Sequence, residues 1–157
     1  MLLLATACGA DGPSLLGPQV AVADLAPFLT SEHVDGVPVT LAVTAPSVQT
    51  GDTVRLVVTV RNATPRLLQI GVQCGPALDV LIGTPEGRVR SALADVTNGG
   101  YFTCELGSQH FLAADSVRVA SMAWVAPATR GVYTAVAGLR RSAGLGNPSA
   151  AVRFTVR

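Results

Sequence analysis

The chain has 157 residues, of which 49% are hydrophobic and 13% are charged, and its formal net charge is +1. This length suits one domain with a substantial core and is too short for two. The eleven strongly basic residues are all arginines scattered along the chain, so the sequence does not support nucleic-acid binding or electrostatic attachment to a membrane surface.

The first eight residues, MLLLATAC, combine a short apolar run with small residues and a cysteine. Bacterial lipoproteins show this order before the cysteine that becomes their acylated N-terminus, and the stretch ending at Cys8 resembles their lipobox. A basic n-region is missing and the apolar run falls short of the usual stretch of about 7 to 15 residues, which we attribute to a start codon placed too far downstream. We expect lipidation at Cys8 and an exported, membrane-anchored location in the cell envelope. The alternative is an ordinary thiol on a frayed end.

Residues 9–36 contain prolines at positions 13, 18 and 27 and show no sustained periodicity. We interpret this segment as a Pro/Gly-rich tether that holds a single domain, residues 37–157, clear of the membrane. The tether could end in a short strand or a helical turn.

A strand pattern begins at residue 37. Alternating apolar residues predict a half-buried strand over residues 37–43 and a clearer one over residues 54–60, separated by the turn SVQTGD. The turn RNATP closes the second strand. A third strand follows, with an apolar face formed by Leu68, Ile70 and Val72.

The second half of the chain predicts further strands. In ALDVLIGTPEGRVRS, two short strands flank the turn TPEG at residues 84–87, where proline presets the first central residue and glycine closes the turn. A long connection over residues 92–107 follows. The remaining strands are predicted at residues 116–125, 131–139 and 151–156.

These segments predict an all-β fold, a two-sheet antiparallel β-sandwich of about 7 to 9 strands. The stretch Gly131-Val132-Tyr133 enters a late strand as a tyrosine corner does, in which a buried tyrosine hydroxyl bonds to backbone upstream. This favours an immunoglobulin-like arrangement. Trp124, the only tryptophan, is expected at the centre of the core.

The run GDTVRLVVTVRNAT, the hairpin LDVLIGTPEGRVR and the stretches SVRVASMAWVAP and GVYTAVAGL resemble the BsuPI-type intracellular proteinase inhibitor family. In that family an alternating strand ending in Asn is followed by a hairpin, and a tryptophan-bearing strand leads into a Gly-x-Tyr strand. The similarity covers residues 39–139. It implies a non-enzymatic domain that binds serine proteinases. The chain departs from the family in its predicted export and its pair of later cysteines, and no segment matches an inhibitory reactive site.

Those later cysteines are Cys74 and Cys104. In an exported protein two such thiols favour a disulfide, which would stabilise the fold by about 3 to 4 kcal/mol in the chain-entropy model. Lipidation would then account for the third, unpaired cysteine, Cys8. The alternatives are two reduced core thiols, or a zinc site that includes His110. Structural zinc ligands usually pair at shorter spacing, so we expect no metal.

Catalytic groups are scarce in this sequence. His33 and His110 lie in no nucleophile or metal pattern and no Gly-x-Ser-x-Gly elbow is present, so we expect neither enzymatic activity nor a cofactor. Asn62 begins a glycosylation sequon but is interpreted as a turn residue. The carboxylates are spread over different connections and are expected on the solvated surface; they include Asp79, Glu86, Asp95, Glu105 and Asp115.

Partner binding is expected in the long connection. It carries Tyr101 and Phe102 beside Cys104, and an aromatic pair anchored by a disulfide would be a preorganised binding site. The alternative is that Phe102 packs into the core. The sequence therefore predicts a non-enzymatic envelope lipoprotein that binds a protein partner. A structural or adhesive envelope module without inhibitory activity is the alternative, and an enzyme is a distant third.

Overall fold

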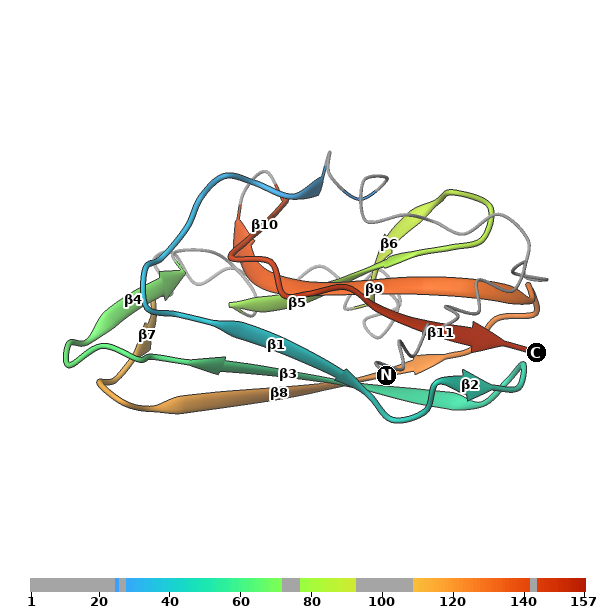
Figure 1. Ribbon diagram of the computed structural model, residues 1–157, viewed down its shortest axis with the longest axis horizontal. Helices are drawn as coiled ribbons and strands as arrows, with labels where there is room; N and C mark the ends of the chain where they lie inside the picture. Colours follow the sequence, from blue (N-terminus) through green and yellow to red (C-terminus); the bar gives the residue numbers. More distant parts are fainter. Residues whose placement is uncertain (1–24, 26–27, 72–76, 93–108, 142–143) are drawn as a thin grey trace, which may run out of the picture.

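The computed structural model describes residue 25 and residues 28–71, 77–92, 109–141 and 144–157. The described residues form eleven strands and confirm the all-β prediction (Figure 1). The strands are β1 (Val39–Val43), β2 (Ser47–Val48), β3 (Thr53–Arg61), β4 (Leu68–Gly71), β5 (Leu78–Gly83), β6 (Val89–Ser91), β7 (His110–Leu112), β8 (Val117–Val125), β9 (Gly131–Arg141), β10 (Gly144–Gly146) and β11 (Val152–Val156). Their number exceeds the expected seven to nine because β2, β7 and β10 are too short to show an alternating pattern.

Two sheets face each other across one hydrophobic core, which is consistent with the predicted β-sandwich (Figure 1). One sheet has the order β1-β3-β8, and the other has the order β2-β11-β9-β5-β6 with β10 added to β9. All pairs are antiparallel except β2 with β11. Strands β4 and β7 form a small third sheet at one end of the molecule.

Strand β3 shows how the alternating pattern produces the core. Successive side chains of a strand point to opposite faces, so every second residue of β3 meets the facing sheet. The charged side chains of Arg55 and Arg61 remain exposed. The fully buried residues are Val54, Leu56, Val58 and Val60. The prediction for this strand is confirmed.

The predicted hairpin at residues 84–87 is also confirmed. Its two strands, β5 and β6, pair in an antiparallel ladder. The Gly87 N–H donates a hydrogen bond to the Thr84 carbonyl at 2.9 Å, and the Thr84 N–H donates to the Arg88 carbonyl at 2.8 Å. Gly87 has φ of +79°, a conformation that glycine adopts without steric cost. The turn therefore places Glu86 at the tip of a closed loop.

The middle of the six-stranded sheet is buried on both faces. Within β5, Leu78, Val80 and Ile82 belong to the core between the sheets. Leu81, which points to the opposite face, is also buried. On the neighbouring strand β9, Val136 pairs with Leu81 and is buried as well. The middle of this sheet therefore differs from β3, which keeps exposed residues on its outer face.

Burial of this second face corrects the expectation for Asp79. Its carboxylate was expected on the solvated surface, but the residue is only 6% exposed. The Ser91 hydroxyl donates to its two oxygens at 2.8 and 2.9 Å, and the Val80 N–H donates to Oδ1 at 2.7 Å. These bonds replace part of the hydration that the carboxylate loses. Glu86 and Asp115 are exposed as expected.

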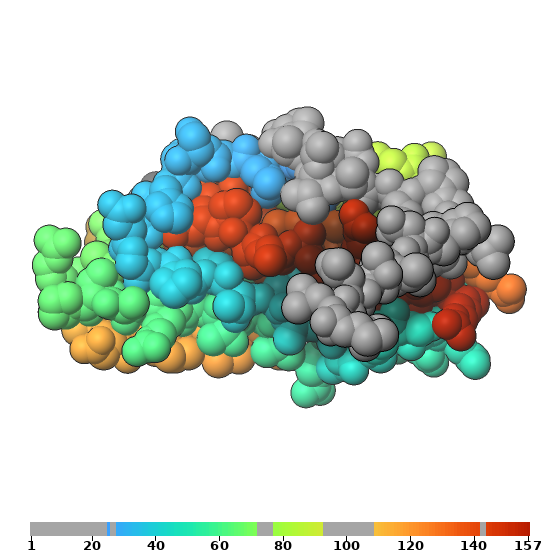
Figure 2. Space-filling model, in the orientation of Figure 1, coloured from blue at the N-terminus to red at the C-terminus, as the bar shows by residue number. Residues whose placement is uncertain are grey.

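Residues 28–36, which we call the N-terminal strap, belong to the predicted tether and lie along β10. Leu29 forms an isolated parallel bridge with Leu145. Gly144 approaches the strap so closely that a Cβ there would collide with the Phe28 carbonyl. Its φ of +137° also favours glycine. Figure 2 shows the blue surface of the strap beside the orange-red surface that includes β10.

Candidate binding pocket

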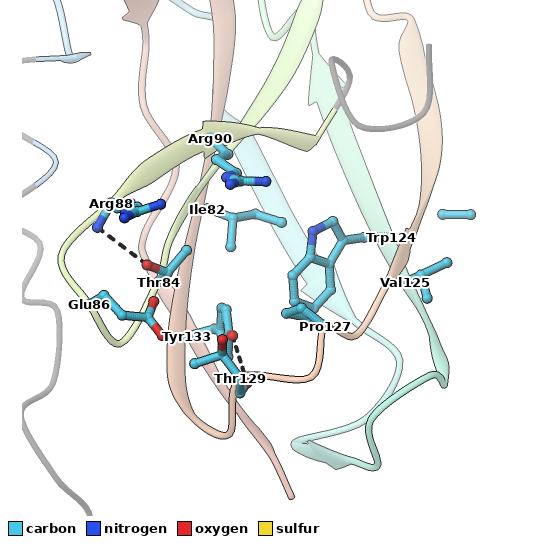
Figure 3. Close-up of a pocket in the computed structure, with 11 residues that line it drawn as sticks. Ile82, Thr84, Glu86, Arg88, Arg90, Trp124, Val125, Pro127, Thr129 and Tyr133 are labelled. Atoms are coloured by element: carbon cyan, nitrogen blue, oxygen red, sulfur yellow. Dashed lines mark hydrogen bonds between the residues drawn. The ribbon is translucent and has the colours of Figure 1, made fainter. Parts of the chain in front are cut away.

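A pocket of about 640 Å³ opens between the edges of the two large sheets (Figure 3). Strand β6 ends the order of the six-stranded sheet, and β8 ends that of the three-stranded sheet. The lining comes from the β5–β6 hairpin, the end of β8 and the segment that leads into β9. Ligand pockets commonly have volumes of about 300 to 1,000 Å³, so this one is large enough to receive a small molecule or side chains of a partner.

Aromatic side chains form the inner wall of the pocket. Trp124 and Tyr133 line it, and Phe154 packs against both. The ring centroids of Trp124 lie 5.3 Å from Tyr133 and 5.5 Å from Phe154, in tilted and edge-on arrangements that aromatic pairs favour. Trp124 is 6% exposed and belongs to the core, as predicted. The cluster supplies a rigid apolar surface.

A hydrogen bond fixes the orientation of Tyr133. Its hydroxyl donates to the Thr129 carbonyl at 2.8 Å, which is the upstream backbone bond that the sequence predicts. Burial raises the pKa of Tyr133, and the negative charge of Glu86 raises it further. The hydroxyl therefore stays protonated at neutral pH and remains a donor.

Charged side chains form the outer wall. Figure 3 shows Arg88 and Arg90 on the hairpin, across the pocket from Trp124. Arg90 pairs with Ile82 in the β5–β6 ladder, so its side chain shares the inner face with that core residue. Among the described residues, neither arginine forms an ion pair with a carboxylate. Two positive charges thus lie beside an apolar wall without a salt-bridge partner in the described structure.

Glu86 adds one negative charge at the hairpin tip. The Thr84 hydroxyl, followed by the backbone N–H of Glu86 itself, lowers its pKa from the ordinary value of 4.5. The Thr129 hydroxyl and the charge of Arg88 act in the same direction. The carboxylate is therefore ionised at neutral pH. The net charge of the rim is positive, which suits a ligand with an apolar body and an anionic group.

Arg88, Arg90 and Thr129 were not predicted from the sequence as site residues. Arg90 could have been recognised, because it follows the TPEG turn at a strand position whose side chain is expected on the inner face of the sheet. A charge on the inner face of a strand is expected only at an edge or a site. The neighbouring edge, β8, comes from a distant part of the sequence, and only the folded chain brings the two together.

The predicted lipidation, disulfide and partner-binding residues cannot be located. Cys8, Cys74, Tyr101, Phe102 and Cys104 all lie outside the described residues. These assignments therefore remain predictions. In the described ranges, no helix is long and apolar enough to cross a membrane.

The histidines do not contribute to the pocket lining. His33 is exposed in the N-terminal strap, with Nε2 3.9 Å from the Asp35 carboxylate. His110 belongs to β7 in the small end sheet. Across the part of the chain that the structure describes, no three His, Cys, Asp or Glu side chains gather in a way that could hold a metal ion.

Comparisons with known proteins identify no family. No family model matches the chain, and no curated protein matches its sequence. Among solved structures, it is similar to the alkylpurine DNA glycosylase AlkC of Pseudomonas fluorescens, bound to DNA containing an abasic site analogue. The identity is 12%, the TM-score is 0.52, and the match covers 81% of this chain and 32% of the glycosylase.

Two further structures are weaker matches. The β-glucosidase EmGH1 of Erythrobacter marinus has 17% identity and a TM-score of 0.49 over 77% of this chain and 15% of the enzyme. The C-terminal domain of wzt has 12% identity and a TM-score of 0.48 over 80% of this chain and 76% of that domain. The chain thus spans only a small part of the first two proteins. The glycosylase match supports the fold alone.

Proposed function

We propose that this chain is a non-enzymatic protein-binding domain, held at the cell envelope by a lipid anchor at Cys8. The observation that carries the binding proposal is the pocket between β6 and β8. Its inner wall is apolar and rigid around Trp124, and its rim carries Arg88 and Arg90 without ion-pair partners among the described residues. The aromatic wall is preorganised for binding, because the buried rings of Trp124 and Tyr133 have little side-chain freedom left to lose.

The proposal includes an immunoglobulin-like arrangement of the sandwich. Strand β3 pairs with β8, and β9 lies between β5 and β11, which are the neighbour relations of strands B–E and C–F–G in that fold. The hydroxyl of Tyr133, near the start of β9, bonds to the carbonyl four residues upstream. A tyrosine corner has this geometry.

The resemblance to BsuPI-type inhibitors suggests a serine proteinase as the partner. The full chain with Cys8→Ser, which stays unacylated, can be titrated against subtilisin-like proteinases. Loss of proteinase activity at micromolar concentrations would support inhibition. Unchanged activity would exclude inhibition of these proteinases and leave a scaffold or an adhesive module as the function.

Capture from envelope extract tests binding itself. Three forms of the Cys8→Ser chain are immobilised: the chain itself, a double variant and a matched control. The double variant carries Arg88→Glu and Arg90→Glu. The control carries Arg66→Glu, at an exposed loop position outside the pocket lining. A partner retained by the control and lost by the double variant would place binding at the pocket. Equal retention by all three proteins would move the binding surface elsewhere.

The anchor and the disulfide have their own measurements. Mass spectrometry of the native protein should find an acylated chain that begins at Cys8, and an intact unacylated chain would exclude processing there. Thiol labelling under denaturing, non-reducing conditions should leave Cys74 and Cys104 unlabelled. Labelling of both would exclude the bond.

The aromatic pair Tyr101 and Phe102 remains a second candidate contact surface. A Tyr101→Ala, Phe102→Ala double variant should lose affinity for the captured partner if the long connection takes part in binding. Full affinity of that variant would exclude the aromatic pair as a contact surface.

A further inference from the structure

Strand β8 is a long edge strand. It contains nine residues and, within the described structure, pairs only with β3. An unpaired edge presents a row of backbone N–H and C=O groups that another strand can bind. The direction of these groups follows from the β3–β8 ladder.

Hydrogen bonds at the two ends of the ladder fix this direction. The Ala126 N–H donates to the Asp52 carbonyl, and the Asn62 N–H donates to the Ser116 carbonyl. Antiparallel partners alternate between hydrogen-bonded and non-bonded pairs, so the even-numbered residues of β8 direct their backbone groups toward β3. The odd-numbered residues direct theirs away, and no described residue bonds to them. These are Val117, Val119, Ser121, Ala123 and Val125.

The other edge strands β1, β2 and β6 of the large sheets have features that prevent pairing with a further strand. Strand β1 has five residues and is bracketed by Pro38 and Pro46, and β2 has only two residues. Strand β6 has three residues and is flanked by Arg88, with Arg90 within it. Short edges, prolines and charges of this kind prevent unwanted strand pairing.

Strand β8 is neither short nor interrupted by proline, and it carries one charge. Its only charged residue is Arg118, whose guanidinium donates to the Phe111 carbonyl at 3.2 Å. Val117, Val119 and Val125 are 54%, 60% and 63% exposed, and no proline interrupts the strand. Among the described residues, this nine-residue, largely apolar strand therefore leaves its outer edge unpaired, whereas β1, β2 and β6 are short and flanked by prolines or charges.

The open edge runs directly into the pocket. Ala123, Trp124 and Val125 line it from the β8 side, and Arg90 lines it from β6. Side chains of an added strand alternate between the two faces, so those on the inner face would point into the space beside Trp124. Arg88 and Arg90 lack ion-pair partners among the described residues, and a carboxylate complements them.

We propose that β8 binds an extended segment of a partner protein as an added strand, and that an acidic side chain of this segment enters the pocket beside Arg90. This inference rests on the proposed protein-binding function and specifies how it works. Main-chain hydrogen bonds along β8 would supply affinity, and the charged pocket would supply specificity.

Defined peptides test the proposal on the Cys8→Ser chain. The probes have nine residues, the length of β8, and alternate valine and threonine with glutamate, glutamine or lysine at the centre. We expect the glutamate peptide to bind about tenfold more tightly than the lysine peptide, with glutamine between them. Arg90→Glu should reverse this order. Equal binding of the three peptides, or no binding of any at millimolar concentration, would overturn the proposal.

A proline substitution tests the backbone pairing. Ser121→Pro removes an N–H that β3 does not use, and edge strands accept proline where the N–H faces outward. We expect it to weaken glutamate-peptide binding at least about tenfold, while the matched control Ser121→Thr keeps full affinity. Unchanged affinity in a folded Ser121→Pro chain would refute strand addition.

Hydrogen exchange supplies a measurement that needs no variant. Saturation with the glutamate peptide should slow the amides of Val119, Ser121 and Ala123 at least about tenfold, while those of Ala120 and Met122, already bonded to β3, change little. Uniform protection, or none, would contradict the proposal.

A concentration-dependent dimer of the chain, abolished by Ser121→Pro, would instead assign the edge to a second copy. An envelope partner that still binds Ser121→Pro would leave protein binding intact and remove strand addition alone.

Discussion

The side chain of Asn147 pairs with the backbone of Val34 as a neighbouring strand would. Its Oδ1 accepts a hydrogen bond from the Val34 N–H at 2.6 Å, and its Nδ2 donates to the Val34 carbonyl at 2.8 Å. Nδ2 also donates to the Val37 carbonyl at 3.0 Å. Asn147 is 4% exposed and has φ of +45°, a conformation that asparagine tolerates better than most residues. The side-chain amide of Asn147 therefore helps to hold the N-terminal strap to the domain, beside the bridge between Leu29 and Leu145.

Replacing Asn147 should loosen the strap. We expect Asn147→Ala to lower the free energy of unfolding by about 2 to 4 kcal/mol, because three hydrogen bonds disappear and alanine is strained at positive φ. Urea denaturation measures the change. Asn147→Gly keeps the backbone conformation and isolates the hydrogen bonds, so its effect should be smaller. A loss below the error of the measurement in both variants would contradict this assignment.

The sequence predicts the sandwich because its strands carry their own pattern. Alternation in β3 identifies the buried face without knowledge of its neighbours, and the TPEG turn identifies the β5–β6 hairpin from local chemistry. The burial of Asp79 was missed because a carboxylate is rarely buried without a partner, and its partner Ser91 is recognised only in the folded hairpin. The runs LDVLIG and VYTAVAGL are nearly continuous in apolar or small residues, which is typical of strands buried on both faces.

The pocket and the strap contact depend on positions that are far apart in the chain. Val34 and Asn147 are 113 residues apart, and no local pattern relates them. Arg90 and Trp124 meet only because two sheets place their last strands on the same side. The inward charge of Arg90 was visible in the sequence, but the edge opposite it was not.

The bond from Tyr133 to Thr129 should make a small, measurable contribution to stability. We expect Tyr133→Phe to lower the free energy of unfolding by about 0.5 to 1.5 kcal/mol, since one hydrogen bond is lost and the ring packing remains. Thermal unfolding checks the value. Thr129→Ala keeps the accepting carbonyl and should leave this contribution unchanged. Equal losses in the two variants would assign the effect to the loop and not to the bond.

Asn62 follows β3 directly, and its side chain bonds to the next loop and to the end of β7. Its Nδ2 donates to the carbonyls of Arg66, Leu112 and Ala113 at 2.6, 3.1 and 2.9 Å, and its Oδ1 accepts from the Thr64 N–H at 2.9 Å. The residue is fully buried. Its amide nitrogen is therefore inaccessible in the folded domain, and we expect no glycosylation at this sequon.

The isosteric change Asn62→Asp should be severe. A carboxylate oxygen would then face three carbonyl oxygens, and we expect the free energy of unfolding at neutral pH to fall by about 3 to 5 kcal/mol. Denaturant unfolding measures it. Thr64→Val, which removes the 2.7 Å hydroxyl bond to Oδ1 and two weaker 3.4 Å bonds with the Arg66 backbone, should lower it by about 1 kcal/mol. A mild effect of Asn62→Asp would show that these bonds contribute little.

The pKa of Glu86 reports the closure of the hairpin at the pocket rim. The Thr84 hydroxyl is the largest cause of its lowered pKa, and the same hydroxyl accepts the Arg88 N–H at 3.2 Å. A lowered carboxyl pKa stabilises the fold above the ordinary value of 4.5, and this stabilisation is lost as the pH falls from there through the folded pKa. We expect Thr84→Val to raise the pKa of Glu86 toward 4.5 and to weaken this acid dependence, whereas Thr84→Ser, which keeps the hydroxyl, should change neither. Carboxyl titration by NMR distinguishes the two variants, and equal pKa values in both would show that the hydroxyl does not set the charge of the rim.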